Sequence, residues 1–293
     1  ARMARSQTSD PMRLMEAWEM NIRGTVLQAR GSSKESTEFF ERGFAITLEV
    51  FGREHPEIAK GLTQRANAKY LAGQYQEALA LHQEALPLYE SLLGPHHPST
   101  ADSINNQAVV HYMLGQNDQA RAMYRRANEI KIAVYGPTHQ RVAMGVQNLA
   151  AVEWATGHYA EAEALYRQAL DIQLQTMGEK HAETATAYNN LGIISKVQGK
   201  HDEAKAAYDK ALEIRTAVLG PQSVEVADSI GSLAGLEAER GNHEAAIEGY
   251  ERALAIQVAE RGADNPANAS DMNNIATSRL ALGQFAKAES GFR

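Results

Sequence analysis

The stretch LGPHHPSTADSINNQAVVHYMLGQNDQARAMYRRANEI, residues 93–130, recurs in altered form at residues 177–214 as MGEKHAETATAYNNLGIISKVQGKHDEAKAAYDKALEI. Each copy opens with a hydrophobic residue and a glycine, and two segments dominated by good helix formers follow. Self-similarity at a fixed spacing is the sequence signature of a repeat architecture. We therefore searched the whole chain for the period before looking for a site.

The period is 42 residues, and two series of glycines follow it. Because glycine is the usual residue just beyond a helix end, two glycines per unit predict two helices per unit. The first series is Gly52, Gly94, Gly136, Gly178, Gly220 and Gly262, and the second is Gly31, Gly73, Gly115, Gly157, Gly199, Gly241 and Gly283.

Small residues keep the same register, among them Ala59, Ala101, Ala143, Ala185 and Ala227. A further set, seven residues later, occupies the same helix face and would let two helices approach closely. β-branched residues do not alternate with polar ones, so strands are not expected. The pattern predicts an all-α chain.

Seven units fit the chain of 293 residues. We expect residues 1–14 to be a leader or boundary segment and residues 15–293 to form a single solenoid. The first unit, roughly residues 15–51, is degenerate, and the last is cut off within its second helix at AKAESGFR.

The pattern resembles the tetratricopeptide repeat (TPR), in the 42-residue form of kinesin light chains, over about residues 15–293. The resemblance implies a right-handed superhelical α-solenoid of antiparallel helix pairs. It also implies that the first helix of each unit lines a concave groove, where such proteins bind an extended peptide through asparagine amides. The resemblance is specific for the fold and unspecific for the function.

The adjacent histidines His96 and His97 raise the question of a metal site. His97 shares its register with His55, His139 and His181, while Ser223 and Asn265 hold the same position later. Equivalent residues on successive helix pairs lie about 8–10 Å apart, too far to share one ion. We instead expect His97 to cap a helix that begins at Pro98, after Gly94 has ended the previous helix in a left-handed conformation.

Composition narrows the remaining functions. The chain has 29 basic and 36 acidic residues, a net charge of −7 and a pI near 5.8, which argues against nucleic acid and anionic membranes as partners. It has no cysteine, so disulfides, thiolate metal sites and cysteine nucleophiles are excluded. The first residues contain no apolar run typical of a signal peptide, so a cytoplasmic location is the default expectation.

No phosphate-binding glycine loop and no G-x-S-x-G elbow is present in the sequence. Acidic residues are interspersed with Lys and Arg, as expected of solvated helix faces. We therefore predict a protein that is not an enzyme and that binds no cofactor and no metal ion.

Asparagine recurs in the middle of the first helices, although it is a poor helix former. Its amides offer both donors and acceptors, so one interpretation is that they bind a peptide. A ladder of hydrogen bonds between stacked helices explains the pattern equally well. The predicted binding amides are Asn67, Asn105, Asn106, Gln147, Asn148, Asn189 and Asn190.

Three aromatics share one register, Tyr70, Tyr112 and Trp154, and Lys196 holds that position in the next unit. They are either groove anchors or core residues, and helical spacing slightly favours the core. The predicted site is completed by two apolar residues of the first helices, Val109 and Ile193.

Gly231 and Gly235 each cost roughly 1 kcal/mol inside a helix, so something should compensate for them. We expect a wider groove there or the close approach of another backbone, with neutral drift as the alternative. Candidate groove positions mix Lys60 with Asp102 and Asp228, which favours a polar or mildly hydrophobic peptide over the acidic cargo of kinesin light chains.

The leading hypothesis is therefore a scaffold that binds a peptide or an extended segment of a partner protein. One alternative is a regulatory arm of a larger enzyme, such as a caspase-like protease or a nucleotide-dependent switch protein, because the sequence starts without methionine and stops within a helix. Another is self-association through the terminal repeats, since an uncapped repeat exposes an apolar face.

Overall fold

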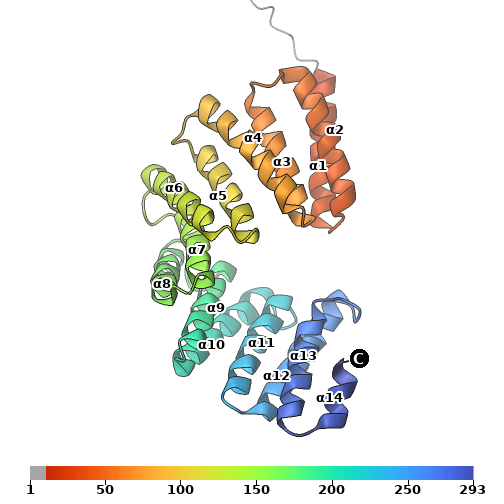
Figure 1. Ribbon diagram of the computed structural model, residues 1–293, viewed down its shortest axis with the longest axis vertical. Coiled ribbons are helices and arrows are strands. Elements are labelled where there is room, and N and C mark those ends of the chain that lie inside the picture. The colour runs from red at the N-terminus through yellow and green to blue at the C-terminus, as the bar shows by residue number, and fades with distance from the viewer. Residues whose placement is uncertain (1–10, 293) are drawn as a thin grey trace, which may run out of the picture. The chain divides into compact units, whose positions relative to one another are not determined.

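The computed structural model describes residues 11–292, and all secondary structure within that range is helical (Figure 1). The chain divides into two compact units, the first ending at Pro137 and the second starting at Thr138. The first unit contains α1 (Pro11–Ala29), α2 (Ser33–Phe51), α3 (Pro56–Leu71), α4 (Tyr75–Leu93), α5 (Pro98–Met113) and α6 (Asn117–Tyr135). The second contains α7 (Gln140–Ala155), α8 (Tyr159–Thr176), α9 (Ala182–Val197), α10 (His201–Leu219), α11 (Val224–Glu239), α12 (His243–Arg261), α13 (Asn268–Ala281) and α14 (Phe285–Phe292).

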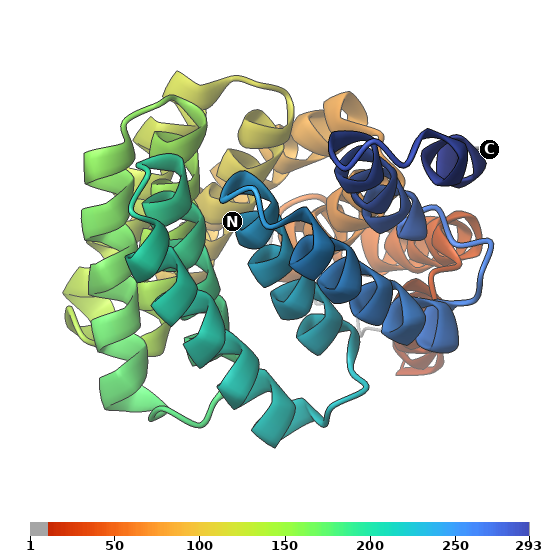
Figure 2. The same cartoon turned by 90° about the horizontal axis from the view of Figure 1, so that it is seen from below.

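Each odd-numbered helix packs against the even-numbered helix that follows it, and the pairs stack in chain order within each unit. Figure 2 shows helices of the second unit, coloured green to blue, lying side by side as antiparallel rods. We call α1, α3 and α5, and α7, α9, α11 and α13, the first helices. Their small residues allow the close packing, and Ala59, Ala101, Ala143, Ala185 and Ala227 are all fully buried. The expected solenoid of helix pairs is confirmed.

Both predicted series of glycines adopt positive φ angles, as their expected role at helix ends requires. Gly73 ends the turn between α3 and α4 in a Schellman motif: the Gly73 N–H donates to the Tyr70 carbonyl and the Gln74 N–H to the Lys69 carbonyl, each at 2.9 Å. Gly94, between repeats, has φ 97° and ψ 156°. The positive φ of Gly94 agrees with the expected left-handed conformation, but its ψ does not. The ψ angle is that of an extended residue, because the chain runs straight on from this turn to Pro95.

The histidines cap helices, as their register predicts. The Nδ1 atom of His97 accepts a hydrogen bond of 3.1 Å from the Ser99 N–H, and His55, His139 and His181 accept equivalent bonds. Asn265, which holds the histidine position in the last repeat, differs. It accepts a hydrogen bond from the Ala267 N–H, but α13 begins only at Asn268. The Asn268 amide donates to the carbonyls of Gly262 and Ala263, much as the Thr100 hydroxyl donates to the Gly94 carbonyl at the same register.

The described helices begin inside the expected leader. Helix α1 starts at Pro11, and the first ten residues of the expected leader 1–14 lie outside the described part of the chain. The first repeat, which is degenerate in sequence, forms a complete helix pair, α1 and α2.

Candidate functional site

Two of the pockets that involve the first helices include predicted binding residues, one pocket in each unit. The pocket of the first unit has a volume of about 300 Å³ and lies between α1, α3, α4 and α5. We call it the Asn67 pocket. Four predicted residues line it, Asn67, Tyr70, Asn106 and Val109, and all four are half-buried.

His82 on α4 also lines the Asn67 pocket, and the sequence analysis did not single it out. Its side chain is 1% exposed, and within the described part of the chain its Nδ1 atom has no hydrogen-bond partner. Burial lowers the pKa of His82 to about 4, so the ring is neutral at physiological pH. The signal that could have found it is a broken register, since the equivalent positions hold Tyr124, Tyr166, Tyr208 and Tyr250.

Of the aromatic register, Tyr70 both packs into the core and lines a pocket. Tyr70 packs against Tyr75 of its own repeat, with ring centroids 5.5 Å apart, and against a buried cluster that contains Val110. The same Tyr70 lines the Asn67 pocket. Tyr112 is half-buried, and Trp154 is 38% exposed.

The remaining predicted amides do not line the Asn67 pocket. Asn105, Asn148 and Asn190 are half-buried on α5, α7 and α9. The Gln147 Nε2 and Asn189 Oδ1 atoms are covered, and neither has a hydrogen-bond partner among the described residues. These two atoms therefore form no rung of the hydrogen-bond ladder that the sequence offered as an alternative.

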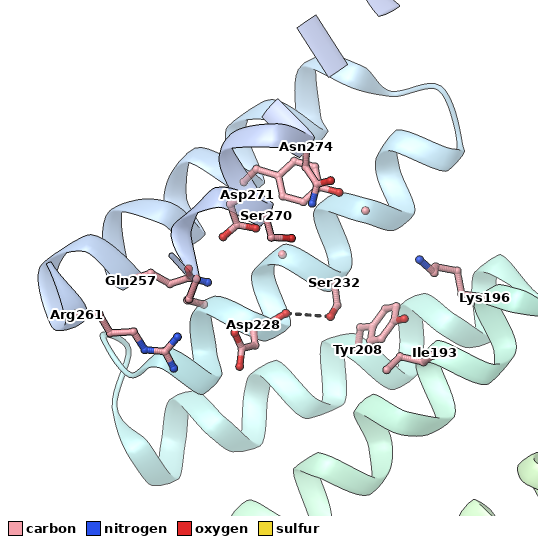
Figure 3. Close-up of a pocket in the computed structure, with 15 residues that line it drawn as sticks. Ile193, Lys196, Tyr208, Asp228, Ser232, Gln257, Arg261, Ser270, Asp271 and Asn274 are labelled. Atoms are coloured by element: carbon pink, nitrogen blue, oxygen red, sulfur yellow. Dashed lines mark hydrogen bonds between the residues drawn. The ribbon is translucent and has the colours of Figure 1, made fainter. Parts of the chain in front are cut away.

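The pocket of the second unit has a volume of about 400 Å³ and is shown in Figure 3. We call it the Asp271 pocket. It is lined by residues of α9 to α13, including the predicted residues Ile193 and Lys196. Lys196 lies at one side of the view, and its ammonium group forms an ion pair of 3.2 Å with Glu239 of α11.

Gly231 and Gly235 both line the Asp271 pocket, where the sequence predicts either a wider groove or the close approach of another backbone. A Cβ atom at Gly235 would lie 3.1 Å from the Tyr250 hydroxyl, and one at Gly231 would lie 3.6 Å from Asp271 Oδ1. Larger residues would therefore fill the space between α11 and its neighbours.

The charged groups of the Asp271 pocket are of both signs. Burial raises the pKa of Asp271, and the neighbouring carboxylate of Asp228 raises it further. The pKa of Asp228 is also raised by burial, although Arg215 and Arg261 partly oppose that shift. In Figure 3, Arg261 lies on the Asp228 side of the pocket and Lys196 on the opposite side.

The described residues contain no cluster of three or more His, Asp or Glu side chains that could hold a metal ion. None of the described helices combines the length and apolar character needed to cross a bilayer. The side chains that line the Asn67 pocket and the Asp271 pocket are suited to hydrogen bonding, ion pairing and apolar contact.

A tetratricopeptide repeat family model matches six overlapping segments: residues 14–90, 57–133, 104–175, 140–216, 183–257 and 229–292. The chain belongs to the tetratricopeptide repeat family. Comparison with curated protein sequences finds no match.

Solved structures with the same fold as this tetratricopeptide array include kinesin light chain-like repeats. A putative kinesin light chain from Podosopora anserina has 24% identity and a TM-score of 0.60, over 71% of this chain and 99% of the other. Aspartyl phosphate phosphatase F from Bacillus subtilis has 16% identity and a TM-score of 0.74, over 96% and 69%. A Rap protein complexed with Competence and Sporulation Factor has 17% identity and a TM-score of 0.65, over 95% and 73%. At these identities the similarity shows the fold alone.

Among the residues of the tetratricopeptide array that line the Asp271 pocket without having been predicted are Tyr250, Gln257 and Asp271. The signal for Asp271 is again a register, because the equivalent positions hold only small residues. They are Gly61, Ser103, Gly145, Ala187 and Ser229, all buried.

Proposed function

We propose that this protein is a non-enzymatic scaffold that binds a peptide, or an extended segment of a partner protein, along its first helices. The observation that carries the proposal is the Asn67 pocket, where two amides, an aromatic ring and an aliphatic side chain meet. Asn67, Asn106, Tyr70 and Val109 come from two successive repeats. A ligand in this pocket would therefore bridge α3 and α5.

The chemistry of this pocket suits a peptide. An extended peptide presents a backbone N–H and C=O at every residue, and each amide side chain can donate to one group and accept from another. Tyr70 and Val109 supply apolar contact of the kind that dominates binding energy at interfaces. The Asn67 and Asn106 amides would then fix the direction of the bound chain.

The charges on the first helices disfavour a strongly acidic ligand. Lys196 is paired with Glu239 at 3.2 Å, and Lys60 lies 3.7 Å from Glu57. Lys131 is buried and lies 3.2 Å from Asp102. Because these lysines already have acidic neighbours, a polar or mildly hydrophobic segment fits better than an acidic one. A Rap protein of the same fold has been solved in complex with a partner, which is consistent with partner binding by such an array.

The test is selection of peptides from a random phage-displayed library on the immobilised protein, followed by fluorescence-anisotropy titration of the selected sequence. The Asn67→Ala, Asn106→Ala double variant should bind it at least tenfold more weakly, because each amide contributes about 1 kcal/mol of hydrogen bonding. Asn117→Ala, at the start of α6, is the matched control and should leave affinity unchanged. Equal affinity of a folded double variant and wild type would reject the Asn67 pocket as the binding site.

A further inference from the structure

Two buried oxygen atoms of the Asp271 pocket lack hydrogen-bond donors. Asp271 is 8% exposed and Gln257 is 7% exposed, and both line the pocket. Within residues 11–292, neither the Asp271 Oδ2 atom nor the Gln257 Oε1 atom has a hydrogen-bond partner. A buried acceptor without a donor is costly, and a buried carboxylate without one more so. Both unmet groups accept, so what satisfies them must donate.

The preceding repeat satisfies the equivalent positions with a pair of its own side chains. Gln257 and Asp271 lie one period after Arg215 and Ser229. The Arg215 Nη1 atom donates to the Ser229 Oγ atom at 2.8 Å and to the Glu225 carbonyl at 3.0 Å. At the Asp271 pocket a glutamine stands in place of the arginine and a carboxylate in place of the serine. These two positions therefore carry a negative charge where the preceding repeat has a positive one.

Space for a ligand is provided by the glycine on the facing helix. The Asp271 carboxylate points towards Gly231, since a Cβ atom there would lie 3.6 Å from Oδ1. The same register in other repeats holds Asn105, Gln147 and Asn189, whose amides would extend into this space. Gly231 thus leaves the Asp271 carboxylate facing a cavity.

The charged residues around Asp271 also favour the binding of a cation. Asp228 of α11 adds a second carboxylate, and its proximity raises the pKa of Asp271. Of the cations that line the pocket, Lys196 is paired with Glu239 and Arg261 lies beside Asp228 in Figure 3. A bound cation would stabilise the ionised form of Asp271.

We propose that the Asp271 pocket binds an N–H-donating cation, the ammonium or guanidinium group of a peptide, with Asp271 and Gln257 as acceptors and Asp228 at the rim. The inference rests on the proposed function, because it assumes that the cation belongs to a bound peptide segment. It adds a preference for positive charge that the Asn67 pocket does not have.

The experiment follows amide chemical shifts of the full chain by NMR during titration with four small probes. N-acetyl-lysine-N-methylamide and N-acetyl-arginine-N-methylamide carry the two side-chain cations, and alaninamide carries a free α-ammonium group. N-acetyl-norleucine-N-methylamide is the neutral match for lysine. At least one cationic probe should shift the amides of Gly231 and Asp271 saturably, and the norleucine probe should not. Comparison of the three cationic probes identifies which cation the pocket binds: a lysine ammonium, an arginine guanidinium or an α-ammonium group.

Two variants make the result specific to the site. Asp271→Asn should weaken binding of the cationic probe at least tenfold, whereas Asp171→Asn, on the exposed face of α8, should leave it unchanged. Gln257→Arg restores the arginine of the preceding repeat, so it should occupy the pocket, abolish probe binding and raise the melting temperature. Equal binding by wild type, Asp271→Asn and Gln257→Arg would overturn the proposal, as would equal shifts with norleucine.

The outcome separates this inference from the proposed function. A phage-selected peptide that loses affinity in the Asn67→Ala, Asn106→Ala variant, while no cationic probe binds at Asp271, would support the scaffold and reject the cation site. Cationic probes that bind at Asp271, with no peptide recovered from the library, would support the site and reject the scaffold.

Discussion

At the scale of single residues, His82 distinguishes its repeat from the others, because it places a titratable ring at a position that holds tyrosine in later repeats. Folding lowers the pKa of its ring from an ordinary value of 6.5 to about 4 because the ring is buried. Between pH 6.5 and pH 4 the unfolded chain therefore binds the proton and the folded chain does not. The contribution of His82 to the free energy of unfolding should fall by about 3 kcal/mol as the pH drops through this window.

The measurement is urea unfolding at pH 7.5 and at pH 4.5, with wild type compared with His82→Tyr. The variant restores the tyrosine of the other repeats, which does not titrate in this range, so its stability should fall less than that of wild type between the two pH values. Identical losses in both proteins would show that His82 is not desolvated as the structure indicates.

The same scale shows how much of the site the sequence could predict. Of the predicted amides, Asn67 and Asn106 line a pocket, whereas Gln147 and Asn189 have covered amide atoms. Asn105 and Asn106 are adjacent in sequence, so they are about 100° apart around the helix and differ in what they contact. Periodicity identifies the helix, but it does not give the rotation of the helix against its neighbours.

At the scale of elements, the start of α5 depends on His97. Its ring accepts the Ser99 N–H at 3.1 Å, and Pro98 follows at the first helical position. His97→Ala should lower the free energy of unfolding by about 1 kcal/mol, because one N–H at the helix start loses its acceptor.

His97→Asn provides the control, since asparagine is among the best capping residues and should preserve most of the stability. Thermal unfolding followed by circular dichroism compares the two. If alanine and asparagine are equally tolerated, the 3.1 Å contact contributes nothing to stability.

Helix number and turns were predictable from sequence because glycine and proline act locally. Both glycine series have the positive φ that their spacing implied. The start of α13 at Asn268 was not predicted, because Asn265 keeps the capping register and accepts the Ala267 N–H although the helix begins later.

At the scale of the whole molecule, the division at Pro137 was invisible in the repeat pattern. Gly136 and Pro137 form the same pair as Gly94 and Pro95, or Gly220 and Pro221, which lie inside a unit. Local chemistry sets each turn, whereas the division into compact units depends on side chains spread over whole helices. A repeat period therefore predicts how pairs are built better than it predicts how many compact units the pairs form.

Because helix pairs pack mainly on their nearest neighbours, a destabilising substitution should affect mainly the repeats next to it. Ile194 of α9 is fully buried against Ala150, Ala162 and Tyr166 of the preceding pair. Ile194→Ala should cost about 2–5 kcal/mol through lost contact and the cavity that remains. In an array held by nearest-neighbour interfaces, that loss concentrates in the adjoining repeats.

Hydrogen exchange measured by mass spectrometry shows which helices the substitution destabilises. Ile194→Ala should speed exchange most in α7 to α10 and least in α13, and Ile132→Ala, at a residue that is 39% exposed, should change little. An equal acceleration across the whole second unit would instead mean that its pairs open together. Its stability would then belong to the unit as a whole, and the sum over neighbouring interfaces would not describe it.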